Sequence, residues 1–218
     1  MAKGSQIQFE FHTVHDPQTG ARVTRLTPAD VLCHRNYFYQ KCFTRDGNKL
    51  LFAGEFDGHR NYYLLDLTTQ TAVQLTERQG ANTFGGFLSP DDKFLFYVKN
   101  ERSLQRVKLA DFSEETVYTV PEDWVGYGTW VANSECTSLV GIEISREDWT
   151  PLSDWKIFQA FYHSNPYCRL LRVDLLSGKS RVIHEKHEWL GHPIYRPFDD
   201  STVAFCHEGP HDLVDARM

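Results

Sequence analysis

Short hydrophobic runs separated by polar turns recur along most of the chain. One unit covers residues 43–76 and contains a turn, a strand-length apolar run and a hairpin that ends in β-branched residues. Residues 88–120 repeat this order, and Asp46 and Asp91, which lie in the two corresponding turns, are 45 positions apart. A period of about 40–45 residues with short strands is typical of β-propeller blades. A β-sandwich, whose strands also alternate with turns, is the alternative.

Two further units follow, and the third is interrupted before its hairpin returns at residues 169–184. The pattern therefore predicts an all-β fold of the β-propeller class. Its blade-like units lie at about 11–40, 41–77, 84–120, 127–185 and 192–218, with an insertion at 143–167. Because each blade buries its faces only against its neighbours, we expect these residues to be roughly the first four blades of a longer propeller. Alone, they should expose an unpaired edge and an apolar flank.

The insertion at residues 143–167 is rich in aromatic residues, and its segment 155–162 has the apolar spacing of a short helix. Two interpretations remain open. The insertion is either a surface lobe that buries its own aromatic side chains or a wall over a binding pocket. Tyr37 and Tyr39 lie at strand spacing, and we interpret them as packing residues.

Composition limits the classes of function. With 218 residues, 41% hydrophobic and 24% charged, the chain is typical of an ordinary globular protein. The net charge of -6 argues against a nucleic-acid groove, which requires a basic stripe. No apolar run is long enough for a membrane span or a signal peptide. The five cysteines contain no C-x-x-C pair, so we expect free thiols and a cytoplasmic protein.

Polar chemistry is concentrated at residues 203–218. His207-Glu208-Gly209-Pro210-His211 matches the letters of the zinc-protease motif, but that motif requires a helix and Pro210 would break one. Arg217 together with His207 and His211 suits an acidic ligand, since a guanidinium binds a carboxylate through two hydrogen bonds. A salt bridge from Arg217 to Asp212 or Asp215 is the alternative.

A second polar cluster contains His184, His187 and His192, with Glu185 and Glu188 among them. The sequence places this cluster in a loop between blades. It is either a solvated polar loop or, through His184 and His187, a pair of metal ligands.

Three segments carry a family resemblance: residues 205–218, 82–87 and 192–197. They resemble those of oligogalacturonate lyases, enzymes of pectin breakdown, and the similarity extends over essentially the whole chain. The resemblance implies a seven-bladed β-propeller. It also implies β-elimination on short oligogalacturonates, mainly digalacturonate, so that the partner is a small acidic oligosaccharide and neither a nucleic acid nor a membrane.

The resemblance also assigns roles to residues. Arg217 matches the family's substrate-contacting arginine and is the predicted catalytic residue. Arg217, His211, His207 and Asp212 are the predicted substrate-binding residues. The family's histidine base and its manganese ligands lie downstream of Met218, so no metal ligand is predicted within this chain. We expect this chain to be the N-terminal portion of the enzyme. A non-catalytic binding or scaffold propeller is the alternative function.

Overall fold

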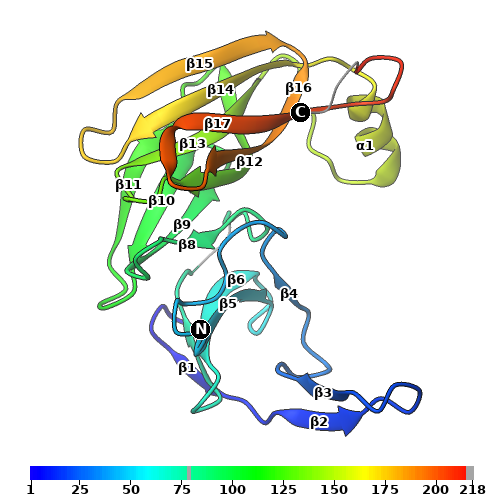
Figure 1. Cartoon of the computed structure of the whole chain (residues 1–218), viewed down its shortest axis with the longest axis vertical. Helices are drawn as coiled ribbons and strands as arrows, with labels where there is room; N and C mark the ends of the chain where they lie inside the picture. The colour runs from blue at the N-terminus through cyan, green and yellow to red at the C-terminus, as the bar shows by residue number, and fades with distance from the viewer. Residues whose placement is uncertain (78–79, 215–218) are drawn as a thin grey trace.

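The computed structural model describes residues 1–77 and 80–214. These residues form an all-β fold in which antiparallel sheets follow one another along the chain, as in a β-propeller (Figure 1). One helix, α1 (Trp155–Tyr162), lies among the described residues, inside the predicted insertion. The predicted fold class is therefore confirmed.

The first sheet has five strands in the order β1-β7-β6-β5-β4. They are β1 (Gln6–Gln8), β4 (Cys33–Arg35), β5 (Lys49–Gly54), β6 (Asn61–Asp66) and β7 (Thr71–Gln74). The predicted units assigned the residues of β4 to 11–40 and those of β5 to 41–77. In the structure the two strands belong to one sheet, where Cys33 pairs with Gly54. The sequence did not reveal this pairing because β4 is short, half-exposed and largely polar.

The second and third sheets have four strands each, in the orders β11-β10-β9-β8 and β12-β13-β14-β15. The second contains β8 (Phe87–Leu88), β9 (Phe94–Lys99), β10 (Ser103–Lys108) and β11 (Glu114–Thr119). The third contains β12 (Trp124–Ala132), β13 (Ser138–Ser145), β14 (Tyr167–Asp174) and β15 (Ser180–His187). Two hairpins complete the described fold: β2 (His12–His15) with β3 (Arg22–Arg25), and β16 (Trp189–Arg196) with β17 (Asp199–Glu208).

The two repeated turns have the same side-chain support. The Asp46 carboxylate accepts a hydrogen bond from the Thr44 hydroxyl at 2.6 Å, and the Asp91 carboxylate accepts one from the Ser89 hydroxyl at 2.7 Å. Such local bonds favour a turn over a continued strand. They hold the pKa of both aspartates below the ordinary value even though burial of Asp91 acts in the opposite direction.

Adjacent sheets pack against each other through buried side chains. Leu51 of the first sheet and Tyr97 of the second belong to one core cluster, and Phe96 and Trp130 belong to the cluster between the second and third sheets. A third cluster, around Trp189, joins the third sheet to β16 and α1. Each sheet thus buries its faces against its neighbours, which is how blades of a propeller are stabilised.

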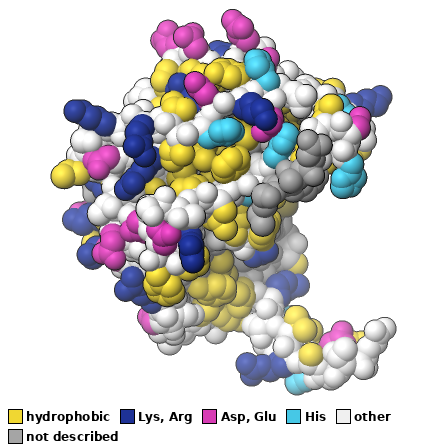
Figure 2. Space-filling view, turned by 45° about the horizontal axis from the view of Figure 1, so that its top comes forward, with side chains coloured by type: hydrophobic (Ala, Val, Ile, Leu, Met, Phe, Trp, Pro, Cys, Tyr) yellow, Lys and Arg dark blue, Asp and Glu magenta, His cyan; other side chains and the backbone are white. Residues whose placement is uncertain are grey.

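The β2–β3 hairpin stands away from the body of the molecule in both views (Figures 1 and 2). Its strands are almost entirely exposed, and Val14 and Val23 face each other in its register. At the other end of the fold, β16 and β17 pair only with each other within the described residues. No helix in the described part of the chain has the length and apolar character needed to cross a membrane.

Candidate functional site

A cavity of about 530 Å³ lies where β12, the β16–β17 hairpin, the turn before β8 and the insertion converge. Its volume is in the range of small-molecule sites. Its largest lining side chains are aromatic, namely Tyr37, Phe84, Tyr127, Trp149, Phe158 and Trp189. The ionisable lining groups besides tyrosine are His192, Glu101 and Glu208. No lysine or arginine among the described residues lines the cavity.

A tight turn before β8 places Phe84 in the cavity wall. The Asn82 Oδ1 atom accepts hydrogen bonds from the backbone N–H groups of Phe84 at 3.1 Å and of Gly85 at 3.2 Å. A Cβ atom on Gly85 would lie 2.3 Å from the Gly128 carbonyl oxygen, so this close approach requires glycine. The backbone N–H of Tyr37 donates to the Phe84 carbonyl at 2.9 Å, which links the turn to the segment after β4.

A bulge in the β16–β17 hairpin directs His192 into the cavity. The pairing register shifts between Gly191 and Ile194, and His192 has a φ of 50°. Bulges re-aim a side chain, and a positive φ is uncommon for a residue with a Cβ atom. Gly191 also makes room for the opposite strand, because a Cβ atom there would lie 2.9 Å from Cγ of Glu208.

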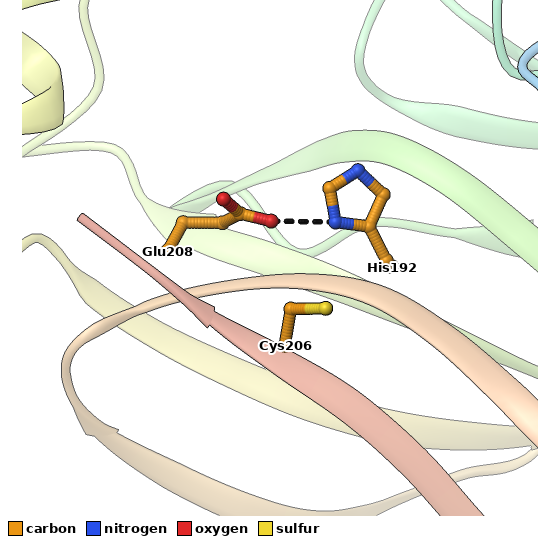
Figure 3. A group of neighbouring side chains, drawn as sticks. All are labelled: His192, Cys206 and Glu208. Atoms are coloured by element: carbon orange, nitrogen blue, oxygen red, sulfur yellow. Dashed lines mark ion pairs between the residues drawn. The ribbon is translucent and has the colours of Figure 1, made fainter. Parts of the chain in front are cut away.

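Both ring nitrogens of His192 are within hydrogen-bond distance of a partner. Nδ1 lies 2.5 Å from Oε1 of Glu208 (Figure 3), and Nε2 lies 2.9 Å from the Tyr37 hydroxyl. The Tyr37 and His192 rings are stacked, with centroids 5.1 Å apart and an interplanar angle of 17°. Three residues that are distant in sequence thus form one connected chain along the cavity wall.

Cys206 completes a group of three potential metal ligands with His192 and Glu208, whose ligand atoms lie within 4.8 Å of one another (Figure 3). Manganese, which the resemblance implies, favours oxygen ligands, and a thiol is a poor match. Two ligands bound at about 2.0–2.2 Å to one ion lie about 3 Å apart, whereas Nδ1 and Oε1 are only 2.5 Å apart. The group therefore fits a hydrogen bond and does not fit manganese.

The tyrosines of the site keep their phenolic protons at neutral pH. Burial raises the pKa of Tyr39 and of Tyr127 far above the ordinary value. Burial also raises the pKa of Tyr37, and the negative charge of Glu208 adds to the effect. The Tyr39 hydroxyl pairs with the hydroxyl of Thr129. Each of these phenols is therefore uncharged at neutral pH.

The insertion has both of the properties that the sequence left open. Asp154 caps α1 by accepting hydrogen bonds from the backbone N–H groups of Lys156 at 2.8 Å and Ile157 at 3.0 Å. Phe161 is buried and packs edge-on against Trp189 at a centroid distance of 4.8 Å, whereas Trp155 is 68% exposed, so the insertion buries part of its aromatic surface. Its other members, Trp149, Leu152 and Phe158, line the cavity and form one wall of it.

The predicted binding residues lie around the end of β17. His207 has its side chain on the strand face opposite to Glu208, with Nδ1 3.6 Å from a Glu188 oxygen, and it does not line the cavity. His211 and Asp212 are exposed in the turn that follows β17. Arg217 and Asp215 lie outside the described residues.

The zinc-protease interpretation is excluded by the backbone. His207 and Glu208 end a β-strand, and Gly209 has a φ of 135°, so no helix brings the two histidines of the motif together. The prediction that His184 and His187 lie in a loop is wrong, because both residues belong to β15. Their rings pack against Phe205 and Tyr167, respectively.

Sequence reasoning missed the connected chain of Tyr37, His192 and Glu208. Tyr37 was interpreted as a packing residue, His192 as part of a loop, and Glu208 only as a letter of the rejected motif. The sequence did offer one signal: Glu208 ends a predicted strand, and another predicted strand begins near His192. Pairing of these two strands would bring the two residues close together. The bulge that turns His192 toward Glu208 has no such signal in the sequence.

Comparisons with known proteins agree with this fold. A family model described as oligogalacturonate lyase matches residues 1–218. An oligogalacturonate lyase of Dickeya dadantii is 68% identical over all 218 residues, and the match covers 56% of that relative. The chain thus spans little more than half the length of this curated relative.

Solved structures give the same result. A structure described as oligogalacturonate lyase in complex with manganese is 72% identical, with a TM-score of 0.95, and the match covers 100% of this chain and 58% of that chain. TolB from Acinetobacter baumannii is 16% identical, with a TM-score of 0.52 over 83% of this chain and 39% of its own, which shows similarity of fold alone.

Proposed function

The chain belongs to the family of oligogalacturonate lyases, and from this premise we propose that the whole protein cleaves short oligogalacturonates by β-elimination. The observation that carries the proposal is the match of the family model to residues 1–218. The cavity supports it, because aromatic walls with a few polar groups are typical of sites for small ligands. We further propose digalacturonate as the main substrate.

The chemistry of the reaction defines what the site must supply. A base removes the proton on C5 of the uronate, beside the carboxylate, and the oxygen on C4 leaves. Negative charge then builds on the carboxylate, which requires a cation at that position. The described lining of the cavity contains two carboxylates and no lysine or arginine, so it does not supply this cation.

Arg217 is the residue that we propose for this role. It follows Glu208, a cavity residue, by only nine positions, and Val214 between them is buried. A guanidinium binds a carboxylate through two parallel hydrogen bonds and stays charged at any working pH. We propose His211, His207 and Asp212 as further substrate-binding residues.

We propose manganese as the cofactor, since a related lyase structure is described as a complex with manganese. A bound divalent cation would neutralise charge on the uronate carboxylate. His192, Cys206 and Glu208 do not fit this ion, so its ligands are expected outside the described residues. The five cysteines form no disulfide, which supports a reducing compartment, and we propose the cytoplasm.

The proposal is tested by incubating the whole protein with digalacturonate and Mn²⁺ and following the absorbance of the unsaturated uronate. Formation of this product is the expected result. If the protein binds digalacturonate and forms no product, the enzymatic function is refuted and the alternative of a binding propeller is supported. Trigalacturonate and longer oligomers, assayed in parallel, test the preference for the dimer through kcat/KM.

A further inference from the structure

One assignment of the hydrogen atoms satisfies every group in the chain of Tyr37, His192 and Glu208. An ionised Glu208 carboxylate only accepts hydrogen bonds, so Nδ1 of His192 donates to it. With a neutral imidazole, Nε2 is an acceptor and the Tyr37 hydroxyl donates its proton to it. In this assignment the phenolic proton is used inside the protein, and the oxygen lone pairs of Tyr37 remain for the cavity.

Three independent features of the backbone and the packing hold this arrangement. The bulge gives His192 its positive φ, Gly191 leaves space for the Glu208 side chain, and the Tyr37 ring lies flat on the imidazole. A non-glycine residue in the left-handed region costs free energy and persists only where its surroundings hold it. A bulge of this kind at the edge of a cavity is typical of functional sites.

We propose that Tyr37, His192 and Glu208 form a hydroxyl-binding subsite of the cavity, in which the Glu208–His192 pair orients Tyr37 so that its oxygen accepts a hydrogen bond from a sugar hydroxyl. The proposal rests on the proposed function and specifies how the cavity recognises an uncharged part of an acidic sugar. His192 and Glu208 are positioning residues, and Tyr37 is the residue that contacts the ligand.

The subsite also sets the direction in which a uronate enters. Tyr37 then presents an acceptor to the cavity, so a hydroxyl can donate a hydrogen bond to it, whereas a uronate carboxylate, which only accepts, cannot. The sugar therefore turns its ring hydroxyl toward this wall and its carboxylate away from it.

The test combines Tyr37→Phe with substrates that lack one hydroxyl. For digalacturonate, Tyr37→Phe should lower kcat/KM about tenfold, the effect of one lost hydrogen bond. For the monodeoxy digalacturonate that lacks the recognised hydroxyl, the same substitution should change kcat/KM by less than about twofold, because the partner is already missing. A tenfold loss with every deoxy analogue, or no loss with digalacturonate, overturns the proposal. Tyr195→Phe is the matched control, since its hydroxyl bonds to Ser138 outside this cavity.

A second measurement separates this subsite from the proposed function. Nitrogen NMR of the His192 ring, without substrate, should show a protonated Nδ1 and an unprotonated Nε2. Tyr37→Phe should shift the Nε2 signal, and Glu208→Gln should mix the two tautomers. A ring with both nitrogens protonated would overturn the assignment. So would ring signals that shift on addition of Zn²⁺ or Mn²⁺ to the wild-type protein but not to the Cys206→Ser variant. The predicted tautomer in a protein without lyase activity would refute the proposed function alone.

Discussion

Arg169 and Glu143 form a buried ion pair, and we predict that breaking it costs far more than breaking an exposed pair of the same kind. Oε2 of Glu143 accepts from Nε of Arg169 at 2.7 Å and from Nη2 at 2.5 Å. The Glu143 side chain is 0% exposed, and the Arg169 guanidinium lies 3.9 Å above the Trp124 ring. Arg169→Met leaves the carboxylate buried without a cation, and such losses are about 3–5 kcal/mol.

The pH dependence of this loss has a definite sign. Burial raises the pKa of Glu143 above its ordinary value, even though Arg169 opposes the shift. The fold thus favours the protonated acid, and this contribution to stability decreases as the pH rises through the raised pKa. Without Arg169 the pKa should rise further. The loss caused by Arg169→Met should therefore be largest near pH 8 and should shrink as the pH falls toward 5.

Urea denaturation at both pH values measures the effect, and two further variants control it. Arg106→Met breaks a comparable pair with Glu115, which is 61% exposed, and should cost less than about 1 kcal/mol. The double variant Arg169→Met with Glu143→Leu removes both charges and should recover most of the stability. A loss below about 1 kcal/mol for Arg169→Met, or no recovery in the double variant, would refute the reasoning.

Three further predictions follow from local geometry. Gly141→Ala should lower the free energy of unfolding by about 1–3 kcal/mol, because a Cβ atom would lie 2.0 Å from the Trp130 ring; an unchanged urea midpoint would show that the ring moves aside. Asp154→Ala should lower the free energy of unfolding by about 1 kcal/mol, because α1 loses its N-terminal cap. It should also raise KM, because the insertion forms a cavity wall. An unchanged KM would show that the stability of the helix does not affect binding. Arg217→Ala should lower kcat/KM about a hundredfold if the guanidinium meets the developing charge, and unaltered turnover would assign Arg217 to a structural salt bridge.

The sequence predicted the elements whose causes are local. The turns around Asp46 and Asp91 depend on side chains within a few residues, and alternation of apolar positions defines the strands between them. The helix at residues 155–162 has the bounds that its apolar spacing indicated. The division of the chain into the units given above otherwise stays a prediction.

Features that depend on contacts between distant segments were not predictable in the same way. β4 joins the first sheet through pairing with Gly54, and its own residues do not show the apolar pattern of a strand. The site depends on a one-residue bulge at His192, and a one-residue shift of register reverses which face a side chain occupies. Periodicity alone assigns His207 and Glu208 to opposite faces but does not show which face meets the cavity.

Under the proposed function, the composition of the cavity shows what its described lining leaves to other residues. Glu101 and Glu208 belong to this lining, and burial keeps the lining phenols of Tyr37 and Tyr127 uncharged by raising their pKa. Such a lining would bind hydroxyl groups and stack against a sugar ring, but its described residues include no lysine or arginine that could bind a carboxylate. Affinity for a uronate would then require a cation from outside the described residues, and the carboxylate would orient the substrate. The wall formed by Tyr37 and His192 would select among uronates by the position of their hydroxyls.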